Sequence, residues 1–338
     1  VPPEGSTDFR DPKVWMHDHI WYMAIGSGKN GKGNVLLYQS NDLLEWSYIG
    51  KMFESQNDEQ GIVWNCPDFF SIGEKDVLIV SPAVFPGNLH FIRKTIYFIG
   101  KMNYQTGVFT AENDGDVDLG FDFYAPQTLV DDQGRIILFG WMDMWFNPMP
   151  SQAYGWAGAM TIPREAFLLT GGKLGFRPVK ELRALRNKHQ SNHSFMITPV
   201  NNELSIMSGD SLEIIVEFEL TTCSAESFGI KLRQSIHSNQ ETVISYNQNS
   251  HELTIDRSSS IQSLENISCY HIAPKPNNTL QLHIFLDRSS LELFVNDGST
   301  TITKRIYPDP SALGVATFAV AGSVKVNSLD VWELTSVG

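Results

Sequence analysis

The chain has 338 residues, of which 42% are hydrophobic and 19% charged, and its formal net charge is −13. This length is sufficient for two ordinary domains with a substantial buried core. The negative charge and the lack of any Lys- and Arg-rich run argue against a nucleic-acid partner. No apolar run is long enough to span a membrane, so no membrane partner is expected, and a cytoplasmic and a secreted location both stay open.

A repeated pattern occupies the first half of the chain. Three segments align without a gap and carry a proline at the same place: Arg10–Trp15, Asn65–Phe70 and Tyr124–Leu129. A second apolar run begins ten residues after each proline: Tyr22–Ile25, Val77–Val80 and Ile136–Phe139. The prolines lie 55 and 59 residues apart, which predicts a diverged repeat of one supersecondary unit. A period of this size, filled with short strands, is typical of propeller blades.

The elements expected in chain order define two all-β domains. Each repeat contains about four short strands separated by Gly- and Asn/Asp-bearing turns, and together the repeats make a domain over residues 1–178. Helix formers at 179–186 predict a linker over residues 179–190. Alternating strands and Ser/Asn-rich turns then predict a β-sandwich over residues 191–338. Its clearest hairpin runs from 280–286 into 291–295 and is followed by the turn residues 296–298.

The residues just before the repeated prolines are the candidate functional site. If the repeats are related by rotation, these residues converge near one axis. Arg10, Asp11, Asn65, Cys66 and Tyr124 would then share a pocket. The other cysteines lie far from Cys66 in the sequence without metal-ligand spacing, so neither a disulfide framework nor a metal site is predicted.

The order of these motifs resembles glycoside hydrolase family 32, which includes invertases, sucrose-6-phosphate hydrolases, inulinases and levanases. The motifs are Phe9–Pro12, Trp64–Phe70, Phe123–Gln127, Gly140–Met142, Met160–Glu165, Gly175–Val179 and Phe285–Gly298. The resemblance implies a five-bladed β-propeller, here incomplete with about three blades, followed by a C-terminal β-sandwich. It also implies a fructose-containing saccharide as the ligand.

The family's reaction is retaining hydrolysis of β-fructofuranosides. One carboxylate attacks the anomeric carbon and a second carboxylic acid protonates the leaving oxygen. A third carboxylate, in the Arg-Asp-Pro motif, holds the hydroxyls of the fructosyl ring. The resemblance gives this third role to Asp11, with Arg10 beside it and Tyr124 lining the fructosyl subsite. This chemistry needs only carboxylates and water, so no cofactor is expected.

The sequence departs from the family pattern at two points of the mechanism. The family's nucleophile lies in a Trp-Met-Asn-Asp-Pro-Asn-Gly segment upstream of the Arg-Asp-Pro motif, and these 338 residues contain no such segment. Asn65 stands where the family has its acid/base glutamate. Because an amide cannot deliver a proton at neutral pH, we expect the chain by itself to be inactive. Asn65 is then either a ligand contact or a structural turn residue.

The other candidate residues each have a structural alternative. Asp11 could be a turn aspartate before proline, and Cys66 is expected to be a small buried filler rather than a nucleophile. Tyr124 and Trp141 could be core aromatics or could stack on a sugar. Asp68 is expected to orient its neighbours from a strand or turn.

Two functional classes follow from these departures. In one, the chain is part of a fructan or sucrose hydrolase whose missing carboxylate comes from other sequence. In the other, it is a non-catalytic protein that binds fructosides or supports a partner. An incomplete propeller leaves strand edges and inner faces open, so a second copy of the chain or a complementing N-terminal segment is expected to cover them.

Overall fold

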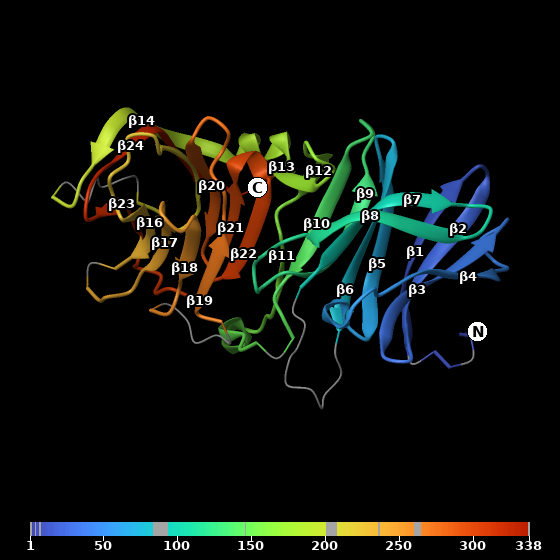
Figure 1. Ribbon diagram of the computed structural model, residues 1–338. Helices are drawn as coiled ribbons and strands as arrows, with labels where there is room; N and C mark the ends of the chain where they lie inside the picture. The colour runs from blue at the N-terminus through green and yellow to red at the C-terminus, as the bar shows by residue number, and fades with distance from the viewer. Residues whose placement is uncertain are drawn as a thin grey trace. The chain divides into compact units, whose positions relative to one another are not determined.

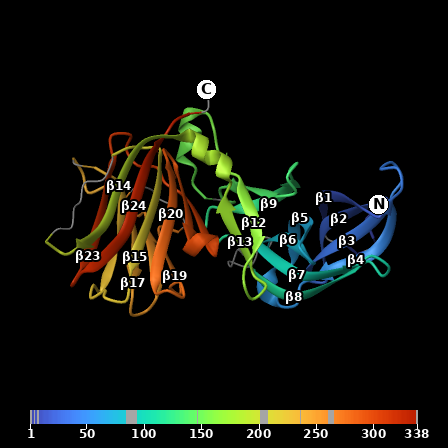
Figure 2. The ribbon, with the colours of Figure 1, turned by 90° about the horizontal axis from the view of Figure 1, so that it is seen from above.

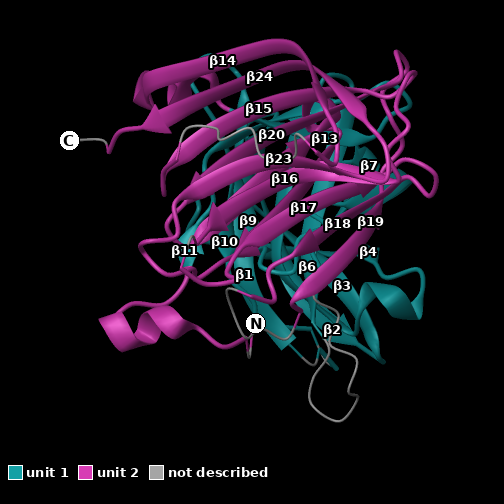
Figure 3. Cartoon of the chain, turned by 90° about the vertical axis from the view of Figure 1, so that its left-hand side faces the viewer, with its two compact units in different colours: residues 1–144, 159–178 teal, residues 145–158, 179–338 magenta. Residues whose placement is uncertain are grey.

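The structure, a computed structural model, describes residues 2–3, 5–6, 8–83, 94–145, 147–200, 208–235, 237–259 and 265–336. The chain forms two compact units, residues 1–144 with 159–178 and residues 145–158 with 179–338, coloured separately in Figure 3. Both consist of β-strands joined by loops and short 3-10 helices, so the expected all-β class is confirmed (Figure 1). Within the described residues, no helix is long and apolar enough to cross a membrane.

The first unit contains three antiparallel sheets in chain order, which lie one after another in Figures 1 and 2. The first sheet has the order β1-β2-β3-β4, with β1 Asp8–His17, β2 Ile20–Lys29, β3 Lys32–Ser40 and β4 Ser47–Glu54. The second has the order β5-β6-β7-β8, with β5 Val63–Ile72, β6 Lys75–Ala83, β7 Ile96–Asn103 and β8 Val108–Asp116. The third contains β9 Tyr124–Val130, β10 Ile136–Met142, β11 Ala159–Met160, β12 Arg164–Leu168 and β13 Leu174–Pro178.

Alternating apolar residues hold these sheets face to face. On β6, Leu78 and Val80 belong to the core shared with the first sheet, whereas Val77 and Ile79 belong to the core shared with the third. Side chains alternate between the two faces of a strand, so a continuous apolar run such as this is the pattern of a strand buried on both faces. The second sheet is therefore the middle layer of the first unit.

Close packing at two glycines fixes Trp64, the residue before Asn65. A Cβ on Gly33 would lie 2.4 Å from Cδ1 of the Trp64 indole, and one on Gly26 would lie 2.3 Å from the Trp64 carbonyl oxygen. The indole also donates a hydrogen bond of 2.6 Å to the carbonyl of Gln60. The start of β5 therefore packs closely against the first sheet, and any side chain larger than glycine at position 26 or 33 would prevent this packing.

The second unit contains two sheets. One has the order β14-β24-β15-β20-β21-β22, with β14 Arg186–Ile197, β24 Val324–Leu334, β15 Leu212–Glu219, β20 Thr279–Asp287, β21 Ser290–Val295 and β22 Thr300–Arg305. The other has the order β19-β18-β17-β16-β23, with β19 Ile267–His271, β18 Glu252–Asp256, β17 Thr242–Asn247, β16 Ser227–Gln234 and β23 Gly314–Val320. Phe218 on β15 and Phe228 on β16 belong to the two different sheets of this unit, and their ring centroids lie 4.8 Å apart, as expected for packed layers.

The expected hairpin is present, because β20 pairs with β21 from Leu282–Val295 to Asp287–Ser290. Strand β14 begins at Arg186, inside the stretch 179–190 that was expected to link the domains. The short 3-10 helices are η1 Asp58–Gln60, η2 Pro150–Tyr154, η3 Lys180–Leu185 and η4 Asn296–Gly298.

Candidate functional site

The residue before each repeated proline has the same unusual backbone conformation. Asp11, Cys66 and Ala125 have φ angles of 57°, 46° and 50°, in the left-handed region that non-glycine residues rarely occupy. Each lies where the strand register shifts, as expected for a β-bulge with one extra residue. The three bulges are therefore equivalent features of the repeat, and strained backbone of this kind is concentrated at functional sites.

The first two bulges are joined directly. Asp11 Oδ2 accepts a hydrogen bond of 3.0 Å from the main-chain N–H of Cys66 and lies 3.3 Å from the Cys66 sulfur. Because this contact occupies one oxygen of the carboxylate, the other oxygen, Oδ1, is not used by Cys66. The structure thus brings together Asp11 and Cys66, two of the five residues that were expected to share a pocket.

The second and third repeats are joined by Asn65 and Tyr124. Asn65 Nδ2 donates a hydrogen bond of 2.9 Å to the Tyr124 hydroxyl. That hydroxyl lies 3.1 Å from the Ser81 carbonyl and 3.3 Å from the Pro82 carbonyl, to which it can donate. The tyrosine oxygen is thus held between an amide donor and two carbonyl acceptors, although Asn65 and Tyr124 are 59 residues apart in the sequence.

Asn65 keeps one unsatisfied polar atom. The residue is only 8% exposed, and within the described part of the chain its Oδ1 has no hydrogen-bond partner. An unsatisfied buried acceptor costs about 1–3 kcal/mol relative to a hydrogen-bonded one. Asn65 Oδ1 could therefore accept a hydrogen bond from a ligand hydroxyl.

Arg10 and Trp141 lie at the margins of this cluster. The Arg10 guanidinium forms an ion pair of 2.6 Å with Asp8, whose hydrogen bond is the main cause of the raised pKa of Arg10. Trp141 is opposite Tyr124 in the β9–β10 register, and both contribute to an apolar cluster with Phe121. The structure therefore places Trp141 beside Tyr124, and it directs Arg10 to Asp8.

A buried ion pair lies immediately behind the bulges. Lys13 Nζ is 2.6 Å from Asp68 Oδ1 and donates a hydrogen bond of 2.7 Å to the Thr128 carbonyl. Asp68 Oδ2 accepts a hydrogen bond of 2.8 Å from the Thr128 main-chain N–H. Three residues from β1, β5 and β9 are thereby joined just after the repeated prolines. This network holds the three strands in fixed relative positions.

Two domain matches that cover nearly the whole chain identify its family. Residues 1–178 match the N-terminal domain of glycosyl hydrolases family 32, and residues 181–333 match its C-terminal domain. The chain belongs to glycoside hydrolase family 32. The expected fold class, a β-propeller family fold followed by a β-sandwich, is confirmed by the solved structures of the family described next.

Similar proteins include a sucrose-6-phosphate hydrolase of Escherichia coli, 35% identical over 99% of this chain and 68% of that protein. A levanase of Bacillus subtilis is 34% identical over 100% of this chain and 52% of its own length. Among solved structures, a GH32 β-fructofuranosidase of Bombyx mori superposes with a TM-score of 0.80 at 28% identity, covering 99% of this chain and 67% of that one. The sucrose-6-phosphate hydrolase of Lactobacillus gasseri has a TM-score of 0.85 at 23% identity over 99% of this chain and 68% of its own.

Burial is the main cause of the raised pKa values of Tyr124, Cys66 and Asp68. Burial raises the pKa of the Tyr124 hydroxyl to about 12, so it is a neutral hydrogen-bond donor at physiological pH. Burial, and then the negative charge of Asp11, raise the pKa of the Cys66 thiol to about 12. A thiol with this pKa is a poor nucleophile. Burial likewise raises the pKa of Asp68, although Lys13 opposes this effect.

Two supporting residues of the site were not predicted. Ser81 Oγ accepts a hydrogen bond of 3.0 Å from the Ala125 main-chain N–H, while its carbonyl lies beside the Tyr124 hydroxyl. Gln127 Nε2 donates a hydrogen bond of 3.2 Å to the Cys66 carbonyl. Ser81 lies opposite Asn65 in the β5–β6 register. The sequence could have indicated Ser81 only through the residue expected to pair with Asn65 on the neighbouring strand.

No cluster of His, Cys, Asp and Glu that could hold a metal ion occurs among the residues whose positions are described. The polar groups of the candidate site are the Asp11 carboxylate, which accepts hydrogen bonds, the Asn65 amide and the Tyr124 hydroxyl. Such a set recognises hydroxyl groups of a ligand through hydrogen bonds.

Proposed function

We propose that this chain binds the terminal β-fructofuranosyl unit of sucrose or a fructan at Asp11, Asn65 and Tyr124. The observation that carries the proposal is the buried Oδ1 of Asn65, which has no partner among the described residues. A fructosyl hydroxyl would supply the missing donor, and the second oxygen of Asp11 would accept from another hydroxyl. Cys66 and Arg10 would line the same subsite, and Trp141 would present an aromatic face.

The names of the relatives support the class of ligand. They include a sucrose-6-phosphate hydrolase and a raffinose invertase of Escherichia coli, 35% and 34% identical to this chain, and a levanase of Bacillus subtilis, 34% identical. One Bombyx mori structure at 29% identity is a complex with sucrose. A fructose-containing saccharide is the chemistry that these names share, so we assign it to this chain.

Asn65 makes binding without turnover the function that the site supports best. The family mechanism requires a carboxylic acid at this position to protonate the leaving oxygen, and an amide has no proton to give at neutral pH. Asn65 also donates to the Tyr124 hydroxyl, which a carboxylate could not do. The chain by itself would therefore be a non-catalytic fructoside-binding member of the family.

Hydrolysis is the second candidate function, and it would need two further carboxylates. One is a glutamate in place of Asn65, and the other is a nucleophile from a complementing polypeptide. The relatives extend beyond the aligned region, which covers 68% of the Escherichia coli protein, so they contain additional sequence that could supply it.

We also propose that a second copy of the chain or a complementing N-terminal segment covers the edge of the first sheet. In the described part of the chain, β1 pairs only with β2, and Val14 and Met16 on β1 are 38% and 50% exposed. An unpaired strand edge with exposed apolar side chains favours association with another strand. Light scattering on the purified chain tests this: a soluble monomer with a cooperative melt would count against it.

The same proposal divides the chain into a propeller-type domain over residues 1–178, a linker over 179–190 and a sandwich over 191–338. The family match over 1–178 supports the end of the first domain, whereas the second match begins at residue 181 and strand β14 at Arg186, both inside the proposed linker. The fructoside site then lies entirely within the propeller-type domain.

Titration calorimetry with sucrose tests the binding function, with trehalose as the matched ligand that contains no fructose. We expect saturable binding of sucrose and none of trehalose. The Asp11→Asn variant should weaken sucrose binding by roughly tenfold, the equivalent of about 1.4 kcal/mol. As a matched control, Asp42→Asn changes an aspartate whose side chain caps a loop of the first sheet. Equal affinities for the two sugars, or no effect of Asp11→Asn, would refute the proposal.

Release of fructose from sucrose tests the second candidate. We expect no release by the native chain. Asn65→Glu should release fructose only when the part of the Escherichia coli relative outside the alignment is added. If that mixture is also inactive while binding persists, the hydrolase function is excluded and the binding function stands.

A further inference from the structure

The direction of the Asn65 side-chain amide is set by the hydroxyl group of Tyr124. Two main-chain carbonyls, those of Ser81 and Pro82, lie 3.1 Å and 3.3 Å from this hydroxyl. Because a carbonyl oxygen can only accept, the single hydroxyl proton of Tyr124 points toward them. The tyrosine oxygen then offers lone pairs to Asn65, and the amide group that can donate to it is Nδ2, at 2.9 Å.

The surroundings of Tyr124 keep its hydroxyl in this arrangement. The residue is 3% exposed and belongs to an apolar cluster with Phe121 and Met144. Burial raises the pKa of the hydroxyl to about 12, so its proton is present at physiological pH. The next residue, Ala125, donates its main-chain N–H to Ser81 Oγ at 3.0 Å, which holds the start of β9 beside β6. The Tyr124 hydroxyl therefore stays a donor to the carbonyls and an acceptor from Asn65.

Asn65 consequently offers an acceptor, and not a donor, to a ligand. Its Nδ2 is directed to Tyr124, and its Oδ1 has no hydrogen-bond partner in the described part of the chain. If the amide were turned over, the one proton of the Tyr124 hydroxyl could not satisfy both Asn65 Oδ1 and the two carbonyls. A ligand atom beside Asn65 Oδ1 must therefore carry a hydrogen, because two acceptors that face each other in a buried site are both left unsatisfied.

The reaction of the family places one particular ligand oxygen beside residue 65. The acid at this position protonates the leaving oxygen, so that oxygen would face Asn65 Oδ1 in a fructoside bound in the same manner. In sucrose the leaving oxygen joins two sugar rings and carries no hydrogen. In free β-fructofuranose the same oxygen belongs to the anomeric hydroxyl, which can donate a hydrogen bond. The two ligands therefore differ at the atom that Asn65 contacts.

We propose that Asn65, with its amide held by Tyr124, makes the site select free fructofuranose over a fructoside, because Asn65 Oδ1 requires a donor at the anomeric oxygen. This inference rests on the proposed function and narrows its ligand class. A fructoside still binds through Asp11, but a hydroxyl other than the anomeric one has to reach Asn65 Oδ1. Tyr124 is then a positioning residue that determines specificity through the direction of the amide.

Titration calorimetry on the full chain with fructose and methyl β-D-fructofuranoside tests the proposal. The fructofuranose and the methyl fructoside differ only in the group on the anomeric oxygen, a hydrogen or a methyl group. Fructose in water is a mixture of ring forms, so the ratio of the two dissociation constants is compared between variants, where the furanose fraction cancels.

Two variants should shift this ratio in favour of the methyl fructoside. Asn65→Leu keeps the size of the side chain and removes the acceptor, and we expect a shift of about tenfold. Tyr124→Phe keeps the ring packing but allows the amide to turn, and it should shift the ratio in the same direction by at least about threefold. The phenylalanine variant also tests the proposal if Asn65→Leu does not fold.

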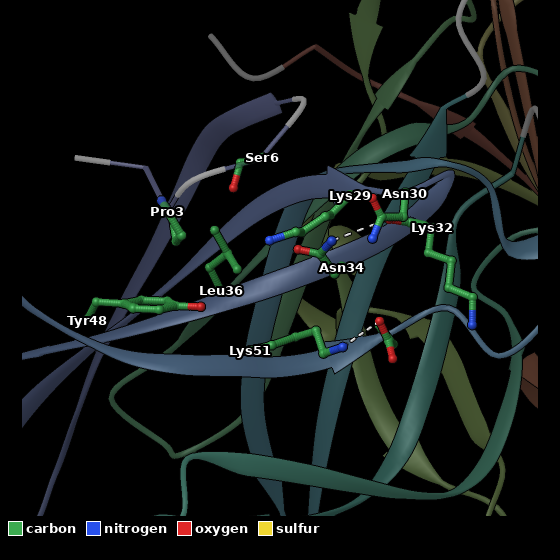
Figure 4. Close-up of a pocket in the computed structure, with 10 residues that line it drawn as sticks. Pro3, Ser6, Lys29, Asn30, Lys32, Asn34, Leu36, Tyr48 and Lys51 are labelled. Atoms are coloured by element: carbon green, nitrogen blue, oxygen red, sulfur yellow. Dashed lines mark hydrogen bonds and ion pairs between the residues drawn. The ribbon is translucent and has the colours of Figure 1, made fainter.

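Asn34→Leu is the matched control. Asn34 is 3% exposed, and its Oδ1 also has no hydrogen-bond partner among the residues that the structure describes. It lines a pocket of the first sheet that shares no residue with the fructoside site (Figure 4). This variant should leave the ratio unchanged. If both ligands bind and the ratio is the same in the wild type, Asn65→Leu and Tyr124→Phe, the inference is overturned and the proposed function stands. If the wild type binds neither ligand, the proposed function itself is refuted, and the inference with it.

Discussion

Lys13 and Asp68 form a 2.6 Å ion pair that joins β1 to β5 directly behind the candidate site. The Asp68 side chain is completely buried and that of Lys13 is 18% exposed, so neither charge is well hydrated. Removing one partner of such a pair leaves the other charge buried without compensation. The pair is therefore expected to hold the first and second sheets in fixed positions relative to each other.

We predict that Lys13→Met lowers the free energy of unfolding by about 3 kcal/mol at pH 7, measured by urea denaturation. Without Lys13, burial would raise the pKa of Asp68 further, so the native variant would take up a proton more readily. The deficit relative to the wild type should then shrink as the pH falls toward 4. Lys75→Met, which breaks an exposed ion pair with Glu112, should cost less than about 1 kcal/mol. A similar loss in both variants would contradict the prediction.

The left-handed conformation of Ala125 predicts an unusual response to glycine. At its φ of 50°, a residue with a Cβ carries roughly 1 kcal/mol of strain, which glycine relieves while adding a similar entropic cost. Ala125→Gly should therefore leave stability nearly unchanged in thermal melts. Ala111→Gly, at a residue of strand β8 whose φ is outside the left-handed region, should lower it by about 0.5–1 kcal/mol. Equal losses would show that the bulge at Ala125 is not strained.

The cysteines should differ sharply in their reactivity toward thiol reagents. Cys269 is exposed, whereas burial and Asp11 raise the pKa of Cys66 to about 12. At pH 8 only on the order of one Cys66 in 10⁴ would be a thiolate. We expect Cys269 to be labelled in the native protein and Cys66 only on unfolding, as followed by peptide mass spectrometry. Rapid labelling of Cys66 in the folded protein would contradict the raised pKa and the contact between Cys66 and Asp11.

Glu213 in the second unit should make the free energy of unfolding decrease at acid pH. Burial opposes its ionisation, but hydrogen bonds from Arg186 and His283 outweigh burial and lower its pKa from 4.5 to about 2. A lowered folded-state pKa adds stability that is present above 4.5 and is lost as the pH falls toward 2.

Glu213→Gln should accordingly lower the free energy of unfolding by about 2 kcal/mol at pH 7 and flatten its pH dependence between 4.5 and 2. Urea denaturation at several pH values measures both effects. Glu333→Gln breaks the more exposed pair with Lys188 and serves as the control, with a change below about 1 kcal/mol. An unchanged pH slope in Glu213→Gln would refute the assignment.

The sequence predicted the fold class and the equivalence of the three proline segments, because their spacing records the repeat directly. It also predicted that Arg10, Asp11, Asn65, Cys66 and Tyr124 converge, but it did not predict which of them form pairs, and the structure joins Asp11 to Cys66 and Asn65 to Tyr124. It did not predict Ser81. This residue belongs to no motif, and its role depends on lying opposite Asn65 in the strand register.

Other features depended on tertiary structure for the same reason. Residues 145–158 group with the second unit although they lie between strands of the first, which the hydrophobic pattern does not record. The unsatisfied oxygen of Asn65 likewise follows from the direction of one amide hydrogen bond.

Difference electron density from crystals of the chain soaked in sucrose tests the fructoside site most directly. We predict a fructosyl ring among Asp11, Asn65 and Tyr124, with one hydroxyl within hydrogen-bonding distance of Asn65 Oδ1 and another at Asp11. Density for sucrose at a different surface, or a site that stays empty at saturating sucrose, would contradict the proposed function.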